Sequence, residues 1–365
     1  MKGRIISTAA ALIAVAVLFS ETVFASPSVS AQSALLYDCG SGRILWEKDA
    51  DAPHLIASTT KIMTGLLICE QCDPDARVRI PEEAVGIEGS SLYLKAGEVL
   101  TVRELLYGLL LQSGNDAAMA LAIFCAGNAE DFVARMNEKA ERLGLTHTEF
   151  ANPHGLDDQK NYSTARDLAL LADAAMDNPL FHEIAATKTV TIGNRTLANH
   201  NKLLWRYEGA VGVKTGFTKQ AGRLLVSAAE RNGRRLIAVT INAPDDWQDH
   251  TRMLDFGFAA FSQQTVLEAG VCLATVPVIG GMESACGAVA AESFSCALLP
   301  EEIPQIRLQL SRMAYAPVRA GAKAGVAEIW LKHDKIGEVE LVWRQSVGQQ
   351  SKTERHGFLS RWFGG

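Results

Sequence analysis

The sequence has no long basic segment, and its formal net charge is −6, so a nucleic-acid partner is not expected. Beyond its first residues it has no apolar run long enough to cross a bilayer. It has no HExxH spacing and a single CxxC pair, so neither a metal ion nor a zinc centre is expected. What remains is ordinary globular composition, 48% hydrophobic and 21% charged, in 365 residues. That length predicts two domains and a tail.

The N-terminus has the order of a secretory signal peptide. Lys2 and Arg4 precede the apolar stretch "IISTAAALIAVAVLF", and the small residues of "VFASPSVSA" follow. We expect a signal peptide over residues 1–25 with cleavage after Ala25; Ala31 is a second candidate site, and an uncleaved anchor helix is the alternative. In either case the folded part is exported across the cytoplasmic membrane.

Seven cysteines at irregular spacings do not form an obvious disulfide framework, and their odd number leaves at least one thiol unpaired. We interpret them chiefly as small buried hydrophobic residues. The alternative is a local Cys69–Cys72 disulfide.

The first part of the chain alternates strand and helix signals. The stretch Ser33–Asp51 predicts two strands around a turn at Cys39–Gly42. A helix is expected to begin near Ser58. Thr101 and Glu104 form a capping box at the start of a further amphipathic helix.

Further helices are expected from Asp116, over residues 131–143 with Gly144 as the stop, and after Thr164. Asn232 and Gly233 then join two strands in a hairpin. Strands therefore lie at both ends of this region and must pair to form one sheet.

We accordingly predict an α+β fold in which helices pack on a mainly antiparallel sheet over residues 32–261. From residue 262 helical periodicity fades, and short apolar runs alternate with Gly, Pro and Ala turns. This pattern predicts a small β-rich domain over residues 262–347, followed by a tail over residues 348–365.

One lysine in the first domain is unusual. Lys61 lies within an apolar helical run, three residues after Ser58, in "HLIASTTKIMTGLL". Residues three apart on a helix face the same way, so the hydroxyl and the amine can touch. Burial or a second cation lowers the pKa of an amine, which can then accept the serine proton. Backbone N–H groups at the helix start can hold an oxyanion.

Two more short motifs follow in order. Ser113-Gly114-Asn115 lies at a helix break, where a hydroxyl and an amide can project into a cleft. Lys214-Thr215-Gly216 supplies a cation, a hydroxyl and a close backbone approach. SxxK, SxN and KTG in this order are the serine acyl-transfer signature of penicillin-binding proteins and serine β-lactamases.

The chain resembles low-molecular-mass penicillin-binding proteins, the serine-type D-alanyl-D-alanine carboxypeptidases with a C-terminal β-domain. The resemblance covers Ser33 to Phe258, with a looser match to about Val347. It is carried by five stretches: "ASTTKIMT", "LLLQSGNDAA", "FANPHGLD", "GVKTGFT" and "MLDFGF".

The resemblance implies roles for residues of this chain. It makes Ser58 the nucleophile and Lys61 its base. Ser113, Asn115 and Lys214 would move protons and orient the substrate, and Thr215 would bind the substrate's terminal carboxylate. Gly216 would let the backbone approach closely, and the N–H groups of Ser58 and Phe217 would form the oxyanion hole. No metal or organic cofactor is implied.

The substrate implied is a peptidoglycan stem peptide ending in D-Ala-D-Ala, from which the terminal D-Ala is removed, and β-lactams are the expected covalent inhibitors. The location implied is the extracytoplasmic face of the membrane or the cell wall. The tail carries Phe358, Leu359, Trp362 and Phe363 beside Lys352, Arg355 and Arg361. It is either a membrane-surface foot or a disordered end.

Other interpretations stay open at this point. A D,D-endopeptidase or a β-lactamase would use the same motifs, and a non-catalytic cell-wall binding protein would keep only the fold. We interpret His154 as part of a structural turn, and His200 as a weaker candidate for the cleft. An arginine that reads the substrate carboxylate cannot be assigned from sequence, and Arg252 is a weak candidate that fits a solvated helix better.

Overall fold

The computed structural model of the protein describes residues 25–350. The predicted signal peptide, apart from Ala25, and residues 351–365 of the predicted tail lie outside this range. Within it, no single helix is long and apolar enough to cross a membrane; one pair of helices passes the test together, but it is bent by 86°.

A five-stranded sheet, in the order β2-β1-β11-β10-β9, organises the first domain. Its members are β1 (Ser33–Asp38), β2 (Arg43–Lys48), β9 (Ala210–Thr218), β10 (Gly222–Arg231) and β11 (Arg234–Ile241). All four pairings are antiparallel, and β1 lies against β11 with Ser33 opposite Ile241. The two ends of the region therefore meet as predicted, and the α+β fold class is confirmed.

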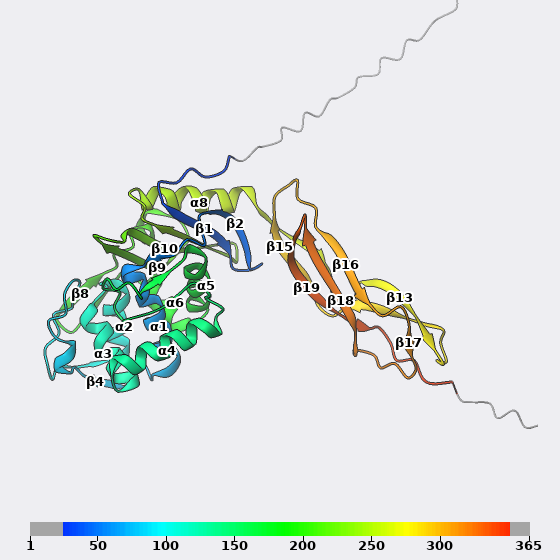
Figure 1. Ribbon diagram of the computed structural model, residues 1–365, viewed down its shortest axis with the longest axis horizontal. Helices are drawn as coiled ribbons and strands as arrows, with labels where there is room; N and C mark the ends of the chain where they lie inside the picture. The colour runs from blue at the N-terminus through cyan, green and yellow to red at the C-terminus, as the bar shows by residue number, and fades with distance from the viewer. Residues whose placement is uncertain (1–24, 351–365) are drawn as a thin grey trace, which may run out of the picture.

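The sheet is buried on both faces, and this explains why all six residues of β1 are buried. Leu35 belongs to the larger core cluster, whereas Leu36 belongs to a second cluster with Met253 and Leu254. Successive side chains of a strand point to opposite faces, so the first cluster lies on one face and the second on the other. Figure 1 shows α8 (Asp246–Ala260) along one side of the sheet and the other long helices across the opposite side.

The helices of that opposite side begin with the 3₁₀ turn η1 (Ala57–Thr60), which continues into α1 (Lys61–Gln71). The others are α2 (Val102–Leu111), α3 (Asn115–Ala126), α4 (Ala129–Arg142), α5 (Ala165–Met176) and α6 (Pro179–Ala186). A short α7 (Leu203–Arg206) precedes β9, and a 3₁₀ turn η2 (Glu82–Ala84) follows β4. Three two-stranded sheets connect these helices: β3 (His54–Leu55) with β6 (Tyr162–Ser163), β4 (Arg77–Arg79) with β5 (Val99–Thr101), and β7 (Thr189–Ile192) with β8 (Arg195–Ala198).

The helix ends follow the capping signals of the sequence. Thr101 caps α2 in a complete capping box, and the Thr164 side chain accepts the Asp167 N–H at the start of α5. The helix expected from Asp116 begins one residue earlier. The helix expected over residues 131–143 runs over 129–142 instead, because the Asn128 side chain accepts the Asp131 N–H.

The second domain is built of strands. Its six-stranded sheet has the order β16-β18-β19-β14-β13-β17, and β12 pairs with β15 beside it. The strands are β12 (Ser262–Leu267), β13 (Cys272–Ile279), β14 (Ala285–Ala290), β15 (Phe294–Leu298), β16 (Gln305–Leu310), β17 (Ala314–Tyr315), β18 (Lys323–Leu331) and β19 (Asp334–Trp343). A C-terminal β-rich domain is therefore confirmed.

The two domains meet near β2 and β15. The Arg43 guanidinium forms an ion pair with Glu302 at 2.5 Å and donates a hydrogen bond to the Ala297 carbonyl. The Arg43 guanidinium also lies 5.5 Å from the Phe261 ring centroid. Both partners of the ion pair are largely buried, so this contact fastens the β-domain to the first domain near β2, an edge strand of its five-stranded sheet.

All seven cysteines are free thiols in the structure, and the alternative of a Cys69–Cys72 disulfide is therefore wrong. The preferred interpretation, small buried hydrophobic residues, holds for Cys286 and Cys296 but not for Cys272, which is exposed. Cys69 and Cys72 lie at the C-terminal end of α1, partly buried against the first core cluster.

Candidate active site

Ser58 and Lys61 meet where η1 becomes α1. Lys61 Nζ lies 3.1 Å from Ser58 Oγ. The turn before them is strained, because Ala57 has a left-handed φ of 44°. Gly155 packs directly against this turn, and a Cβ at that position would collide with the Ala57 carbonyl oxygen. The turn thus has no room for another conformation.

The Lys61 side chain is completely buried and is surrounded by oxygen atoms. Its amine donates to Asn115 Oδ1 at 2.7 Å and to the His154 carbonyl. These two partners can only accept, so they use two N–H groups of the amine. A neutral amine then directs its remaining lone pair at the Ser58 hydroxyl, and the protonated form would donate to the same oxygen.

Burial lowers the pKa of Lys61 well below its usual value. The nearby Lys214 cation lowers it further, whereas the Asp116 carboxylate acts in the opposite direction. Burial alone also lowers the pKa of Lys214, to about 7. Burial and the Lys214 cation therefore act in the same direction, and both disfavour the charged form of Lys61.

The segment Ser113–Asn115 joins α2 to α3. Ser113 is buried and adopts a left-handed φ of 60°, an uncommon conformation for a residue with a side chain. The Asn115 N–H donates to the Ser90 carbonyl at 2.7 Å, and its Nδ2 donates to the Glu88 carbonyl at 2.5 Å. These contacts hold the Asn115 Oδ1 atom toward Lys61.

Lys214, Thr215 and Gly216 lie on β9, the edge strand of the sheet, which packs against η1. A Cβ at Gly216 would lie 3.3 Å from the Ile56 carbonyl oxygen, closer than most real contacts. The glycine therefore allows the strand to approach the turn that carries Ser58. Lys214 Nζ donates to the Thr215 carbonyl at 2.9 Å.

A cleft of ≈ 320 Å³ opens above these groups, and a second hollow of ≈ 390 Å³ adjoins it at Ser58 and Phe217. Ser58, Ser113, Thr215, Gly216 and Phe217 line the first, so the structure brings these predicted residues together. Asn115 and His154 line the second. Lys61 and Lys214 lie beneath the surface, in contact with groups of the cleft.

The cleft also contains basic side chains that the sequence did not single out firmly. His200, Lys202 and Arg223 line it, and Arg223 forms an ion pair with Asp246 at 2.8 Å. Burial, and then the nearby Lys214 cation, lower the pKa of His200. Arg223 lies five residues beyond the KTG-containing strand β9, across the β9–β10 turn. Only the pairing of the two strands in a hairpin brings it back to the cleft.

The structure gives Arg252 and His154, the weaker candidates from the sequence, different positions. Arg252 is exposed on α8 and donates to the Ser28 carbonyl, and it does not line the cleft. His154 lies in a turn where its Nδ1 accepts the Leu156 N–H, and burial lowers its pKa to about 4. Its backbone carbonyl, and not its ring, contacts Lys61.

Comparison with known proteins identifies the family. A family model described as D-alanyl-D-alanine carboxypeptidase matches residues 20–245, more than half of the chain. The chain belongs to the D-alanyl-D-alanine carboxypeptidase family. A second model, described as the C-terminal domain of penicillin-binding protein 5, matches residues 261–349.

The relatives agree along nearly the whole chain. D-alanyl-D-alanine carboxypeptidase DacF of Bacillus subtilis is 32% identical over 90% of this chain and 87% of its own length. DacC of Escherichia coli is 34% identical over 94% of this chain and 91% of its own length. The crystal structure of penicillin-binding protein 5 from Haemophilus influenzae matches with a TM-score of 0.79 and 30% identity, covering 90% of this chain and 100% of that one. The protein is a serine-type D-Ala-D-Ala carboxypeptidase, as predicted.

Asp116 fastens the loop that holds Asn115 in this carboxypeptidase. Its buried carboxylate accepts the N–H groups of Leu92 and Leu94 and the hydroxyl of Ser91. Hydrogen bonds to Asp116 therefore hold the loop over residues 86–98 against the start of α3.

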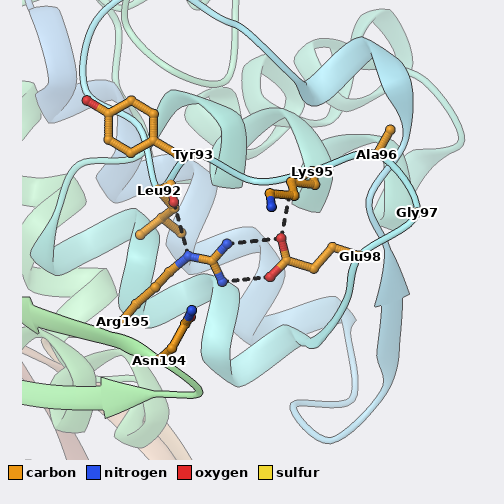
Figure 2. A pocket seen from close by; sticks show the side chains of 8 residues that line it. All are labelled: Leu92, Tyr93, Lys95, Ala96, Gly97, Glu98, Asn194 and Arg195. Atoms are coloured by element: carbon orange, nitrogen blue, oxygen red, sulfur yellow. Dashed lines mark hydrogen bonds and ion pairs between the residues drawn. The ribbon is translucent and has the colours of Figure 1, made fainter.

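Arg195, at the start of β8, also holds this loop through contacts with its residues. It forms a two-point ion pair with Glu98, at 2.6 and 3.0 Å, and Nε donates to the Leu92 carbonyl at 3.1 Å. Figure 2 shows this clamp inside a hollow of ≈ 650 Å³ that shares no lining residue with the catalytic cleft. We interpret the hollow as the outer side of the loop and the clamp as a positioning device.

The clamp can be tested by substitution. Arg195→Ala should lower the second-order rate of acylation by penicillin by roughly twofold to fivefold, since partly exposed ion pairs contribute at most about 1 kcal/mol. The loss should appear in kcat for a peptide substrate more than in KM, because the loop positions Asn115 and not the substrate's end. Stopped-flow acylation and steady-state kinetics measure both.

Two variants control this test. The exchange Arg195→Glu with Glu98→Arg should recover most of the rate. Lys139→Ala breaks a comparable ion pair with Glu70, at 2.6 Å between α4 and α1, and should leave acylation unchanged. Native acylation in Arg195→Ala, confirmed as folded, would remove the positioning role.

Proposed function

We propose that Ser58 is the nucleophile of this carboxypeptidase and that the neutral amine of Lys61 is its general base. One observation carries the proposal: Lys61 is completely buried, donates to two acceptor-only oxygens, and lies 3.1 Å from the Ser58 hydroxyl. A neutral amine in this setting has its lone pair directed at the serine proton and can accept it.

The reaction proceeds through an acyl-enzyme. As Ser58 Oγ attacks the carbonyl carbon of the penultimate D-Ala, its proton passes to Lys61. Collapse of the tetrahedral intermediate breaks the peptide bond, and the departing D-Ala nitrogen takes the proton that Lys61 received, which leaves the amine neutral again. Water then attacks the ester and gives a proton to Lys61, and the shortened peptide is released as Ser58 Oγ takes that proton back. The N–H groups of Ser58 and Phe217 are the proposed oxyanion hole.

Ser113, Asn115 and Lys214 are the proposed proton-handling and orienting groups. Asn115 holds the Lys61 amine from one side, at 2.7 Å. Ser113 lines the cleft, and the Lys214 amine lies buried beside it with a pKa lowered to about 7 by burial. A group with a pKa near the working pH can both give and take a proton, which suits the leaving nitrogen.

The substrate is proposed to lie along β9, whose outer edge faces the cleft. An edge strand offers unpaired backbone groups, so an extended stem peptide can pair with it. Its free carboxylate would then reach Thr215 and Arg223, which line one cleft. Arg223 supplies the arginine that the sequence left unassigned, and its ion pair with Asp246 holds its position.

The alternatives have less support. A non-catalytic wall-binding protein would not need Lys61 buried in contact with Ser58. A D,D-endopeptidase or β-lactamase is not favoured, because the relatives described above are named carboxypeptidases. The family places β-lactams among the expected inhibitors and the extracytoplasmic face of the membrane or the cell wall as the working location. We also propose that this chain is exported through its predicted leader.

The nucleophile is tested by covalent labelling. Ser58→Ala should abolish labelling by a fluorescent penicillin without changing the thermal unfolding midpoint, because the hydroxyl makes no other described contact than with Lys61. Gel fluorescence measures the adduct, and peptide mass spectrometry locates it in the native enzyme. Ser262→Ala, at an exposed position on β12, should label like the native enzyme. An adduct that maps to Ser113 would show the assignment to be wrong.

Recognition of the free terminus is tested with two peptides. Thr215→Val should reduce kcat/KM for a peptide ending in D-Ala-D-Ala roughly tenfold to a hundredfold, since a hydrogen bond to a charged group is worth about 1.5–3 kcal/mol. The loss should be much smaller for the same peptide ending in an amide. Equal losses on both peptides would show that Thr215 does not read the carboxylate.

The two arginines provide a matched comparison in the same assay. Arg223→Gln should lower kcat/KM selectively for the free-acid peptide. Arg252→Gln, outside the cleft, should leave both peptides unaffected. The arginine assignment fails if the two variants behave alike.

A further inference from the structure

Two cysteines meet where two helices of the first domain end. Cys72 is the residue directly after α1, and Cys125 is the last residue but one of α3. These two helices pack against each other. Both cysteines are partly buried and pack against the edge of the first core cluster. The proposed acyl transfer uses neither thiol, so they are available for another role.

The two thiols lie within hydrogen-bonding reach of each other. The Cys125 thiol donates to Gln71 Oε1 at 3.5 Å, and Gln71 immediately precedes Cys72 in the chain. The Cys72 thiol is itself a hydrogen-bond partner of Cys125. A disulfide forms only between cysteines whose side chains point toward each other, and this pair meets that condition.

Arg135 of α4 makes Cys125 the more acidic thiol of the pair. Its Nη1 atom donates to Gln71 Oε1 at 2.9 Å and to the Cys125 carbonyl at 3.2 Å, and it lies 3.7 Å from Cys125 Sγ. A hydrogen bond from Cys72 lowers the pKa of Cys125, burial acts in the opposite direction, and the Arg135 cation lowers it further, to about 7. The pKa of Cys72 is raised, first by its hydrogen bond with Cys125 and then by burial. Near neutral pH the thiolate of the pair therefore forms at Cys125.

Two other cysteines have different surroundings and serve as controls. Burial, and then the Glu70 carboxylate, raise the pKa of Cys69 to about 12. A thiol with so high a pKa is a poor nucleophile at neutral pH. Cys272 is exposed in the β-domain, where its thiol donates to the Ala274 carbonyl at 3.4 Å.

We propose that Cys72 and Cys125 are an oxidisable dithiol, which becomes a disulfide between α1 and α3 by exchange with a low-molecular-mass disulfide. The Cys125 thiolate attacks one sulfur of this reagent and forms a mixed disulfide, and the first reagent thiolate departs. The Cys72 sulfur then loses its proton, attacks the Cys125 sulfur and displaces the second reagent thiolate. The protons of the two protein thiols pass through water to the two departing thiolates. Two protein thiols are thus oxidised, and one disulfide is reduced to two thiols.

The helices joined by this bond are the ones that hold the active site at their other ends. Lys61 begins α1, Asn115 begins α3, and Lys61 Nζ donates to Asn115 Oδ1 at 2.7 Å. The disulfide would fasten the C-terminal ends of the same pair. It lowers the entropy of the unfolded chain, so it should stabilise the first domain and leave the resting site unchanged.

The proposal goes beyond the proposed function, because acyl transfer requires neither thiol. It agrees with the proposed export, since disulfides form and persist in the oxidising surroundings outside the cytoplasm. The bond itself can be tested in the purified protein, whatever its location in the cell.

The experiment is oxidation of the reduced chain, from residue 26 onward, with oxidised glutathione at pH 7. Mass spectrometry of a non-reduced digest should find the Cys72 peptide joined to the Cys125 peptide. The unfolding midpoint of the first domain should be roughly 5–10 °C higher in the oxidised protein than in the reduced protein. Differential scanning calorimetry measures this shift.

Serine variants separate this pair from the other cysteines. Cys125→Ser should lose both the joined peptides and the rise of the midpoint, whereas Cys69→Ser and Cys272→Ser should keep both. A Cys69–Cys72 bond, or glutathione that stays on Cys125 in the native chain, would overturn the proposal. Penicillin labelling at room temperature should be the same in every variant, which shows that each is folded and keeps this test distinct from that of Ser58.

The role of Cys125 as the attacking thiol is tested through its cation. Arg135→Gln should slow disulfide formation at pH 6 roughly threefold, because the pKa of Cys125 rises and less thiolate is present. Arg142→Gln, at an exposed position on the same helix, should react at the native rate. Equal rates in the two variants would contradict attack by Cys125.

Discussion

The burial of one amine, that of Lys61, is the constraint on which the site depends. An amine removed from water is costly when charged, and this one is completely buried beside a second lysine. It is tolerated because Asn115 Oδ1 and the His154 carbonyl accept its N–H groups. Its remaining position, the lone pair of the neutral amine, points at the Ser58 hydroxyl, which suits the proposed role as base. The same burial that would destabilise an ordinary surface lysine suits this one to the proposed role of base.

The fold supplies the surroundings of that amine from three distant segments. The η1–α1 turn carries Ser58, the start of α3 carries Asn115, and the edge strand β9 carries Lys214. Close packing holds these segments together: the sheet places β9 against η1, Gly155 fills the space beside the turn, and Asp116 ties the loop before α3 in place. The strained φ values of Ala57 and Ser113 lie at these junctions, where the surrounding contacts leave no alternative.

The sequence predicted the residues of the site better than the supports beneath them. Ser58, Lys61, Asn115 and Lys214 stand in short motifs whose chemistry is local, and the pairing of β1 with β11 followed from strands at both ends. The roles of Arg223 and Arg195 depend on a hairpin and on a loop contact that no local pattern encodes. The CxxC pair left a disulfide open as an alternative for the same reason, since this spacing alone does not decide whether two thiols meet, and in the structure both are free.

The central claim, that Lys61 is neutral in the resting enzyme, is tested most directly by the pH dependence of acylation. The second-order rate of penicillin acylation reports the ionisation of the free enzyme, and it should rise as Lys61 loses its proton. Because the pKa of Lys61 is lowered, the midpoint of this rise should lie well below that of an ordinary lysine, about 10.4. The His200→Gln variant should keep the same rise, which excludes the histidine as its source. A midpoint near pH 10 would contradict the account.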